Sequence, residues 1–351
     1  MKTKFFKSLL AIACLLSSTN VSAQESFIID SIVYVPISGS SCMIGSLKSY
    51  DGDCQIPETV VYNNKTYTVT AIISKGFRNK NLTSVTIPNS VTKIGSSAFQ
   101  DCTNLTNVII GNSVTEIEDD AFKGCTNLTS VTIGSSVTKI GTSMFEECTN
   151  LTSITIPNSV TEIGNNAFRG CTSLTNIIIP NSVKKIENMA FNGCTGLKSV
   201  TIPNSVKEIE SSAFSECTGL TSVTIPNSVK EIKDYTFEDC DNLTSITIPN
   251  SVTKIGDGAF SGCGISKITL PKSVTEIGVD IVGGCKSLTA LYSLNTIPPK
   301  VGSIVFFGDK LDGFRSVNKA LKVFVPRSAL AAYKQAYGWK NFQNLQGFDP
   351  K

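Results

Sequence analysis

The chain has 351 residues, of which 41 % are hydrophobic and 17 % are charged, so it can bury a large core and lacks the composition of a disordered or coiled-coil chain. It contains no histidine, which excludes Ser-His-Asp and Cys-His catalysis and every histidine-ligated metal site. The net charge of +3 comes from three lysines among residues 1–23, and the neutral remainder offers no electrostatic basis for binding nucleic acid.

Residues 1–23 have the pattern of a secretory signal peptide. Three lysines precede an apolar stretch over residues 9–16, and residues 21–23 (Val-Ser-Ala) have the small side chains of a cleavage site. The pattern predicts Sec-dependent export, cleavage after Ala23, and a protein that is secreted or held at the cell surface, in the outer membrane or outside the cell. No stretch is long and apolar enough to predict a transmembrane segment. A lipid-acceptor role for Cys14 is an alternative, but the residues before it fit that motif poorly.

Residues 24–72 are expected to form a β-rich N-terminal cap. Segments 27–36 and 55–72 alternate apolar and polar residues, which predicts short antiparallel strands. Cys42 and Cys54 lie in this part of a chain that is predicted to be exported. A structural disulfide between them is therefore one expectation, and two thiols are the other.

Residues 73–288 contain about nine copies of a repeat of 22 or 23 residues. Each full copy has a cysteine and, three residues before it, a phenylalanine. In the last copy Val282 takes the position of the phenylalanine. The cysteines are Cys102, Cys125, Cys148, Cys171, Cys194, Cys217, Cys240, Cys263 and Cys285. This regularity is the signature of a solenoid, in which each coil packs on the next.

One copy, over residues 151–173, shows how a coil is built. Leu151, Ile154 and Ile156 follow the L-x-x-L-x-L pattern of a leucine-rich-repeat strand, and the Pro-Asn-Ser sequence at 157–159 turns the chain. Val160 and Ile163 are expected to point inward, and residues 167–171 are expected to form a short helical turn. The sequence thus predicts an α/β repeat fold, a right-handed solenoid with a parallel β-sheet on its concave face.

Residues 289–351 are expected to form the C-terminal cap. Residues 321–325 alternate as a strand, and residues 328–337 have the pattern of an amphipathic helix with Ser328 as its N-cap. The prolines at 298–299 indicate an irregular connection before the strand.

The repeat motif L-x-x-V-x-I-P-x-S-V-x-x-I-G-x-x-A-F-x-x-C resembles the BspA-like leucine-rich repeats of bacterial surface proteins, also called the Treponema pallidum type. The resemblance spans roughly residues 60–350 and includes the C-terminal block from Val325 to Phe342. It implies an exported adhesin or interaction protein rather than an enzyme.

The cysteine file resembles a reactive or metal-binding array, but its spacing disfavours both. Equivalent residues of stacked coils lie about 4.8 Å apart and point in parallel, whereas a disulfide needs Cβ atoms near 3.8 Å that face each other. Burial also raises the pKa of a thiol. We therefore expect buried thiols that act as small apolar side chains, and no metal site or cofactor.

Two further motifs have structural explanations. Ser90 and Lys93 match the S-x-x-K motif of serine acyl-enzymes, but the lysine position carries Glu116 in the next copy, so we expect a solvated surface position and no catalytic residue. Asn-Leu-Thr sequences, as at Asn127 and Asn150, match the N-glycosylation acceptor. Because they stand where the strand begins, their side chains are expected to satisfy backbone groups between coils.

The outward side chains of the predicted strands form the best candidate binding surface. The predicted ligand-binding residues are Ser84, Thr86, Asn107, Ile109, Thr132, Thr155, Asn176, Ile178, Thr201, Thr224, Thr247, Lys267 and Tyr292. Most copies carry Ser and Thr in these two positions, and two copies carry Asn and Ile instead. Partner contacts at Ile109 and Ile178 are the hypothesis, and neutral drift is the alternative.

The sequence predicts a non-enzymatic interaction or adhesion protein that binds an extracellular protein or glycoprotein on its concave face. A glycan-binding surface module is the first alternative, although only Tyr292 offers an aromatic side chain there. A structural spacer is the second. Ice binding by the threonine rows is disfavoured, because Ile109 and Ile178 interrupt them.

Overall fold

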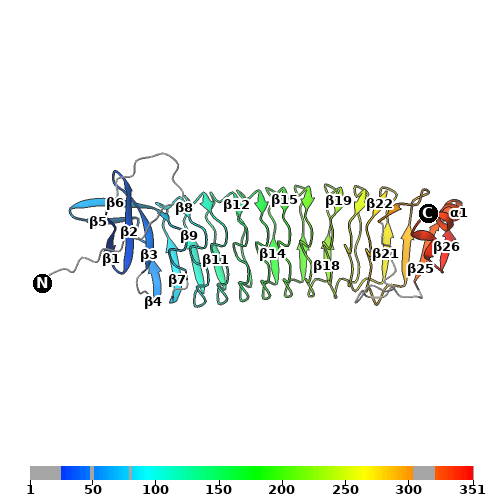
Figure 1. Ribbon diagram of the computed structural model, residues 1–351, viewed down its shortest axis with the longest axis horizontal. Coiled ribbons are helices and arrows are strands. Elements are labelled where there is room, and N and C mark those ends of the chain that lie inside the picture. The colour runs from blue at the N-terminus through cyan, green and yellow to red at the C-terminus, as the bar shows by residue number, and fades with distance from the viewer. Residues whose placement is uncertain (1–24, 48–50, 79–80, 303–320, 351) are drawn as a thin grey trace.

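The structure is a computed structural model that describes residues 25–47, 51–78, 81–302 and 321–350. The predicted signal peptide and Cys14 lie outside the described residues. The chain forms an elongated rod of stacked coils, with the N-terminal strands at one end and the C-terminal helix at the other (Figure 1). No helix within the described residues is long and apolar enough to cross a membrane.

The N-terminal cap consists of strands that precede the first full coil. Strands β1 and β2 pair antiparallel, as do β2 and β3, and as do β5 and β6. Strand β3 pairs in parallel with β6, and β6 continues in parallel into the solenoid. The bounds are β1 (Phe27–Ile29), β2 (Ile32–Ser38), β3 (Ser41–Leu47), β4 (Asp51–Gln55), β5 (Thr59–Tyr62) and β6 (Lys65–Ile72).

The predicted repeat strand forms one side of the rod. Alternation places Val and Ile in the core and Ser and Thr outside, and neighbouring strands pair in parallel with equivalent residues opposite each other. We call the outward side of these strands, together with that of the equivalent residues 153–155 and 245–247, the Thr face. The strands are β7 (Asn81–Ile87), β9 (Asn107–Ile110), β11 (Ser130–Thr132), β14 (Asn176–Ile178), β16 (Ser199–Thr201), β18 (Ser222–Thr224), β21 (Lys267–Leu270) and β23 (Ala290–Ser293).

A second row of parallel strands, absent from the sequence prediction, consists of strands of two residues each and is hydrogen-bonded in three separate stretches. Each strand combines a charged residue that faces outward with an isoleucine or valine that packs inward, and most of the strands follow a Pro-Asn-Ser turn. We call it the short-strand sheet. Its strands are β8 (Lys93–Ile94), β10 (Glu116–Ile117), β12 (Lys139–Ile140), β13 (Glu162–Ile163), β15 (Lys185–Ile186), β17 (Glu208–Ile209), β19 (Glu231–Ile232), β20 (Lys254–Ile255), β22 (Glu276–Ile277) and β24 (Lys300–Val301).

The predicted helical turn at residues 167–171 is wrong. The segment forms successive hydrogen-bonded turns, in which Asn166 and Gly170 have positive φ angles of 54° and 71°. These left-handed residues break any helical path. Alternate N–H groups therefore bond to the next coil instead, as from Phe168 to the Ala190 carbonyl oxygen at 2.8 Å.

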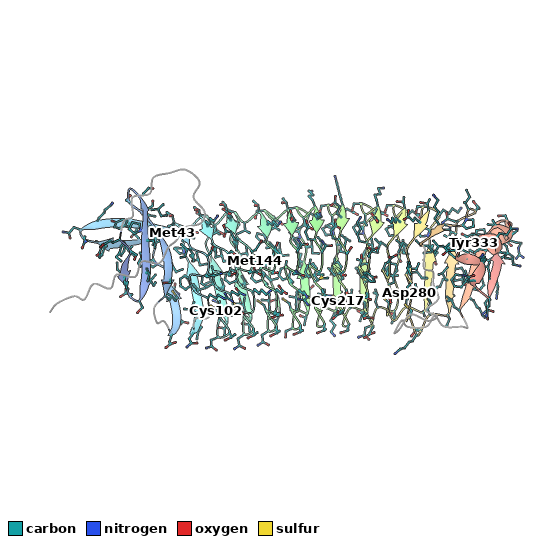
Figure 2. All side chains as sticks on the ribbon, viewed as in Figure 1. Met43, Cys102, Met144, Cys217, Asp280 and Tyr333 are labelled. Atoms are coloured by element: carbon teal, nitrogen blue, oxygen red, sulfur yellow. The ribbon has the colours of Figure 1, made fainter. Side chains whose placement is uncertain are left out.

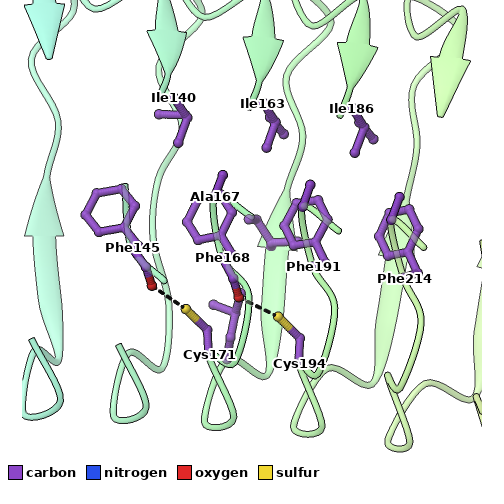
Figure 3. Close-up of a cluster of buried hydrophobic side chains, with 14 of the residues drawn as sticks. Ile140, Phe145, Ile163, Ala167, Phe168, Cys171, Ile186, Phe191, Cys194 and Phe214 are labelled. Atoms are coloured by element: carbon purple, nitrogen blue, oxygen red, sulfur yellow. Dashed lines mark hydrogen bonds between the residues drawn. The ribbon is translucent and has the colours of Figure 1, made fainter. Parts of the chain in front are cut away.

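The core between the two sheets is a set of side-chain files that run along the rod (Figure 2). From Phe77 to Phe260, each phenylalanine ring stacks on its equivalent in the next coil, with centroids 4.8–5.9 Å apart. The thiol of Cys194 donates to the Phe168 carbonyl oxygen at 3.1 Å, and the same contact recurs coil after coil (Figure 3). In each coil, the small cysteine side chain thus gives a hydrogen bond to a buried carbonyl oxygen of the preceding coil.

The C-terminal cap closes the rod with β25 (Lys322–Pro326), β26 (Leu345–Phe348) and the helix α1 (Leu330–Gln335), flanked by 3-10 turns η1 (Arg327–Ala329) and η2 (Trp339–Asn341). The helix is shorter than predicted, and Ser328 is not its N-cap, because the chain enters from η1 and Ala329 takes that place. Tyr333 and Ser293 share a hydrogen bond of 2.7 Å, and Trp339 donates to the Pro299 carbonyl oxygen at 2.9 Å. These buried polar contacts hold the cap on the last coils.

Replacing Phe168 by alanine is expected to lower the free energy of unfolding by about 3–5 kcal/mol, because it removes a fully buried ring from the file. Urea denaturation followed by circular dichroism measures the loss. Ile178→Thr is the control, since it changes an exposed side chain to the residue of most other coils, and should alter stability by less than about 0.5 kcal/mol. Equal losses in both variants would contradict the core position of Phe168.

Candidate functional site

The Thr face brings most of the predicted ligand-binding residues into one file. Register pairs link Thr86 to Ile109, and Ile109 to Thr132, across β7, β9 and β11. Isolated bridges through Thr155 continue the file to Ile178, and β16 and β18 extend it through Thr201 and Thr224. Thr247 lies in a segment without strand pairing, so it interrupts the sheet but keeps its place in the repeat.

A second file, two residues earlier in each strand, holds the other predicted residues. Ser84 pairs in register with Asn107, and Asn176 pairs with Ser199. Ser84 donates its hydroxyl to the Asp53 carboxylate at 2.8 Å, so this end of the file is bonded to strand β4 of the cap. The hydrogen bonds from Thr83 and Ser84 lower the pKa of Asp53.

Threonines just before several strands of the Thr face serve the stack rather than a ligand. The hydroxyl of Thr106 donates to the Thr83 carbonyl oxygen at 2.9 Å, and that of Thr129 donates to the Thr106 carbonyl oxygen at 3.0 Å. Of the asparagines just before them, Asn242 behaves as predicted and donates to the Thr218 carbonyl oxygen. Asn150 instead donates to the side chain of Asn127.

The two isoleucines of the Thr face have different surroundings. Ile178 is 74 % exposed, whereas Ile109 is 41 % exposed. Ile178 borders a cavity of about 580 Å³ that spans three coils, and Ile109 is not among its lining residues. Thr201, Thr224, Pro203, Pro226, Asn181 and Asn204 are further lining residues. We call this cavity the central groove; its lining carries no charged side chain.

Aromatic side chains gather at the C-terminal end of the Thr face. Lys267 places its ammonium 4.5 Å from the centroid of the Tyr292 ring, and Tyr292 stacks on Phe324 with centroids 4.6 Å apart. Phe348 lies perpendicular to both rings, 5.5 Å from Tyr292. We call these residues the aromatic cluster. Sequence analysis missed Phe324 and Phe348 because they belong to the cap, where the repeat register no longer identifies equivalent positions.

The cysteine file has the predicted form of buried thiols. Burial raises the pKa of Cys171 and Cys194 well above the usual range of a thiol, so these side chains are neutral donors rather than nucleophiles. No cluster of potential metal ligands occurs among the described residues.

The predicted alternative of a disulfide between Cys42 and Cys54 is not realised in the structure. Both side chains are buried thiols. Cys42 lies in β3, which pairs with β6, whereas Cys54 lies in β4, which pairs with β7, so the two strands belong to different sheets. Burial raises the pKa of Cys42 to about 11.

Charged residues that resemble catalytic groups are held in ion pairs. Lys93, of the S-x-x-K sequence, lies 3.0 Å from Glu116 and 2.6 Å from Glu118. The carboxylate of Glu146 is only 5 % exposed and binds Lys123 and Arg169 at 2.8 and 2.9 Å. Burial would raise the pKa of Glu146, but hydrogen bonds from Lys123, Ser143 and Arg169 outweigh it and lower the pKa below its usual value. The geometry suits structural ion pairs between coils.

Comparison with known proteins agrees with this architecture. The sequence matches a family model described as the BspA type leucine rich repeat region, over residues 70–182 and 161–289. No curated protein sequence matches the chain significantly.

Two solved structures resemble the chain along most of its length. A leucine-rich repeat protein from Bacteroides ovatus is 28 % identical, with a TM-score of 0.66 over 92 % of this chain and 76 % of that protein. A leucine rich cell surface protein from Faecalibacterium prausnitzii is 25 % identical, with a TM-score of 0.55 over 93 % of this chain and 95 % of that protein. Both show that such a repeat folds as a solenoid.

Titration with a thiol reagent at about pH 8 tests the cysteine assignment, since buried thiols with raised pKa values react slowly. The folded chain over residues 24–351 is expected to react at fewer than one of its eleven cysteines within minutes, and at all eleven in strong denaturant. A count of nine in denaturant would show that Cys42 and Cys54 are bonded after all. Rapid reaction of several thiols in the folded chain would contradict the buried file.

Proposed function

Because the chain belongs to the BspA-type leucine-rich repeat family, we propose that it is an exported, non-enzymatic interaction or adhesion protein that binds an extracellular protein or glycoprotein on its Thr face. The family suggests an interaction role in general, and the described Faecalibacterium prausnitzii relative is a cell surface protein. Export of this chain is proposed from the signal-peptide pattern of residues 1–23.

The observation that carries the proposal is Ile178. It is the most exposed hydrophobic side chain of the Thr face, and it stands where most coils carry threonine. A large aliphatic side chain at a solvent position gains free energy when a partner covers it, and such residues mark interaction sites when they border a concave surface. The central groove supplies that concavity beside Ile178.

Recognition on this surface is shallow and spread over several coils. The Thr face exposes hydroxyl and amide groups from strand after strand, and the central groove spans only three of them. A stable complex buries roughly 800 Å² on each partner, so it needs several neighbouring coils. Affinity then comes from area and from one apolar anchor, not from a deep pocket.

The replacement Ile178→Thr is expected to weaken partner binding about tenfold or more, because the anchor loses most of its apolar area. The measurement is binding of the chain over residues 24–351 to a panel of extracellular-matrix proteins and glycans at physiological salt. Ile109→Thr is run in parallel to show whether the second isoleucine contributes.

Met189→Asn is the matched control for this experiment. Met189 is 43 % exposed but lies in the turn before Phe191, away from the Thr face, and Asn166 holds the equivalent position one coil earlier. Its replacement should leave affinity unchanged. Equal binding by the original chain and the Ile178→Thr variant would refute the central groove as the site, and no binding to any panel member would favour the structural spacer.

A second candidate function, glycan binding, is favoured by the aromatic cluster. Aromatic rings bind sugars through their apolar faces, and three rings, from Tyr292, Phe324 and Phe348, meet at one end of the Thr face. From the sequence, Tyr292 is the one aromatic side chain expected on that surface. The partly exposed cluster, together with Lys267, could hold a sugar as a separate subsite.

Replacing Tyr292 by threonine, the residue of most equivalent strand positions, tests this second function on a glycan array. If glycans bind the aromatic cluster, their signal should fall at least about fivefold, since the stacking surface is lost. Binding of protein partners in the central groove should persist. Thr224→Ser, a small change on the same face, is the control, and an unchanged glycan signal in Tyr292→Thr would exclude the cluster.

A further inference from the structure

One position of the repeat changes character in three consecutive coils. It precedes the charged residue of each short strand, and it is threonine in most coils. The threonines are Thr92, Thr115, Thr138, Thr161, Thr253 and Thr275. In the three coils between Thr161 and Thr253 the position carries Lys184, Lys207 and Lys230, which we call the lysine file. All three side chains are exposed.

The lysine file lies beside acids, Glu208 and Glu231 among them, but forms no ion pair with them in the described part of the chain. The acids beside it on the short-strand sheet are already paired: Glu187, Glu208 and Glu210 lie 3.2–3.4 Å from Lys185. Glu231 lies 2.6 Å from Lys233 and 3.3 Å from Lys254. None of the three lysines of the file forms an ion pair in the described part of the chain.

Like charges in neighbouring coils are unfavourable at a separation of about 4.8 Å. The adjacent position of the short strands shows how the chain avoids this elsewhere. From Lys93 to Glu208 the sign alternates at every coil, Glu231 then repeats the sign of Glu208, and the alternation resumes at Lys254 and Glu276. Three consecutive unpaired lysines therefore oppose the stacking of the coils, and a ligand that neutralises them would remove this repulsion.

The lysine file and the central groove occupy the same three coils. The groove is lined by residues between Asn176 and Pro226, including Asn181 and Asn204 of the Pro-Asn-Ser turns. Lys184 and Lys207 follow those two asparagines by three residues, so the Cα atoms of each lysine and its asparagine are at most about 10 Å apart. The lysines thus lie just beyond the turns that form one edge of the groove.

We propose that the partner bound in the central groove is an extended acidic protein segment, whose carboxylates pair with Lys184, Lys207 and Lys230 while an apolar side chain covers Ile178. This inference rests on the proposed function and specifies the chemistry of the partner. The neutral lining of the groove favours an aliphatic side chain over a charged one, and the lysine file supplies the charge complementarity.

A sulfated or carboxylated glycan is the competing ligand, and the groove suits it less well. Its lining includes no aromatic side chain on which a sugar ring could stack. Its apolar area comes instead from Ile178, Pro203 and Pro226, which fit the aliphatic side chain of a peptide.

The test uses a fluorescent peptide of three tandem Glu-Leu-Glu-Ser units, with matched peptides that carry glutamine or lysine in place of glutamate. The chain over residues 24–351 should bind the acidic peptide about tenfold more tightly than the glutamine peptide at about 50 mM salt, and much of this preference should disappear at about 500 mM salt. Fluorescence anisotropy gives each affinity.

The triple variant Lys184→Thr, Lys207→Thr, Lys230→Thr restores the residue that most other coils carry, so it should fold, and it should abolish the preference for the acidic peptide. The matched control removes three exposed lysines elsewhere, as Lys272→Asn, Lys286→Thr and Lys322→Ser, with an equal change in net charge. This control should keep the preference.

The outcomes separate this inference from the proposed function. Loss of panel binding in Ile178→Thr, with no effect of the triple variant on any ligand, would overturn the acidic partner and leave the groove as the site. No preference for the acidic peptide, or tighter binding of a sulfated oligosaccharide lost in the triple variant, would also overturn it. Loss of acidic-peptide binding in both the Ile178→Thr variant and the triple lysine variant would support the acidic partner.

Discussion

The hydrogen-bonded register between successive coils is the constraint on which the rest of the structure depends. Backbone N–H groups bond to carbonyl oxygens 22 or 23 residues away, as from Thr161 to Thr138 and from Phe168 to Ala190. Parallel stacking in register places every residue above its own equivalent. Each position of the repeat must therefore tolerate contact with itself. Phenylalanine does so by stacking, cysteine and threonine by donating to a carbonyl of the preceding coil.

The same constraint explains why charge is scarce and ordered in this chain. A charged residue repeated in register meets its own sign about 4.8 Å away. Along the short-strand sheet, lysine and glutamate alternate except at Glu208 and Glu231, and they form ion pairs between coils, as between Lys139 and Glu162. The fold does not require residues that depart from the stacking and alternation patterns of the repeat. Ile178, the lysine file and the aromatic cluster are departures of this kind, which is why they are the features that point to binding.

Sequence reasoning succeeded where period and alternation carry the information. The 23-residue spacing predicted the solenoid, the alternation in residues 151–156 predicted the strand, and the fixed geometry of stacked coils predicted buried thiols rather than disulfides. It failed at the short-strand sheet, because two residues are too few to show alternation. It also failed at residues 167–171, where positive φ angles at Asn166 and Gly170 replace a helix. The groove beside Ile178 depends on the relative placement of three coils, which no single copy reveals.

The coil spacing also sets the geometry that a partner must match. Groups that contact adjacent coils must be about 4.8 Å apart, whereas Ile109 and Ile178 are three coils and therefore about 14 Å apart. One compact side chain cannot cover both isoleucines, so they belong to one interface only if the partner follows the rod axis. The 41 % exposure of Ile109, away from the groove, makes Ile178 the anchor of any smaller contact. An elongated partner and a single-site partner should thus differ in their response to the two isoleucines.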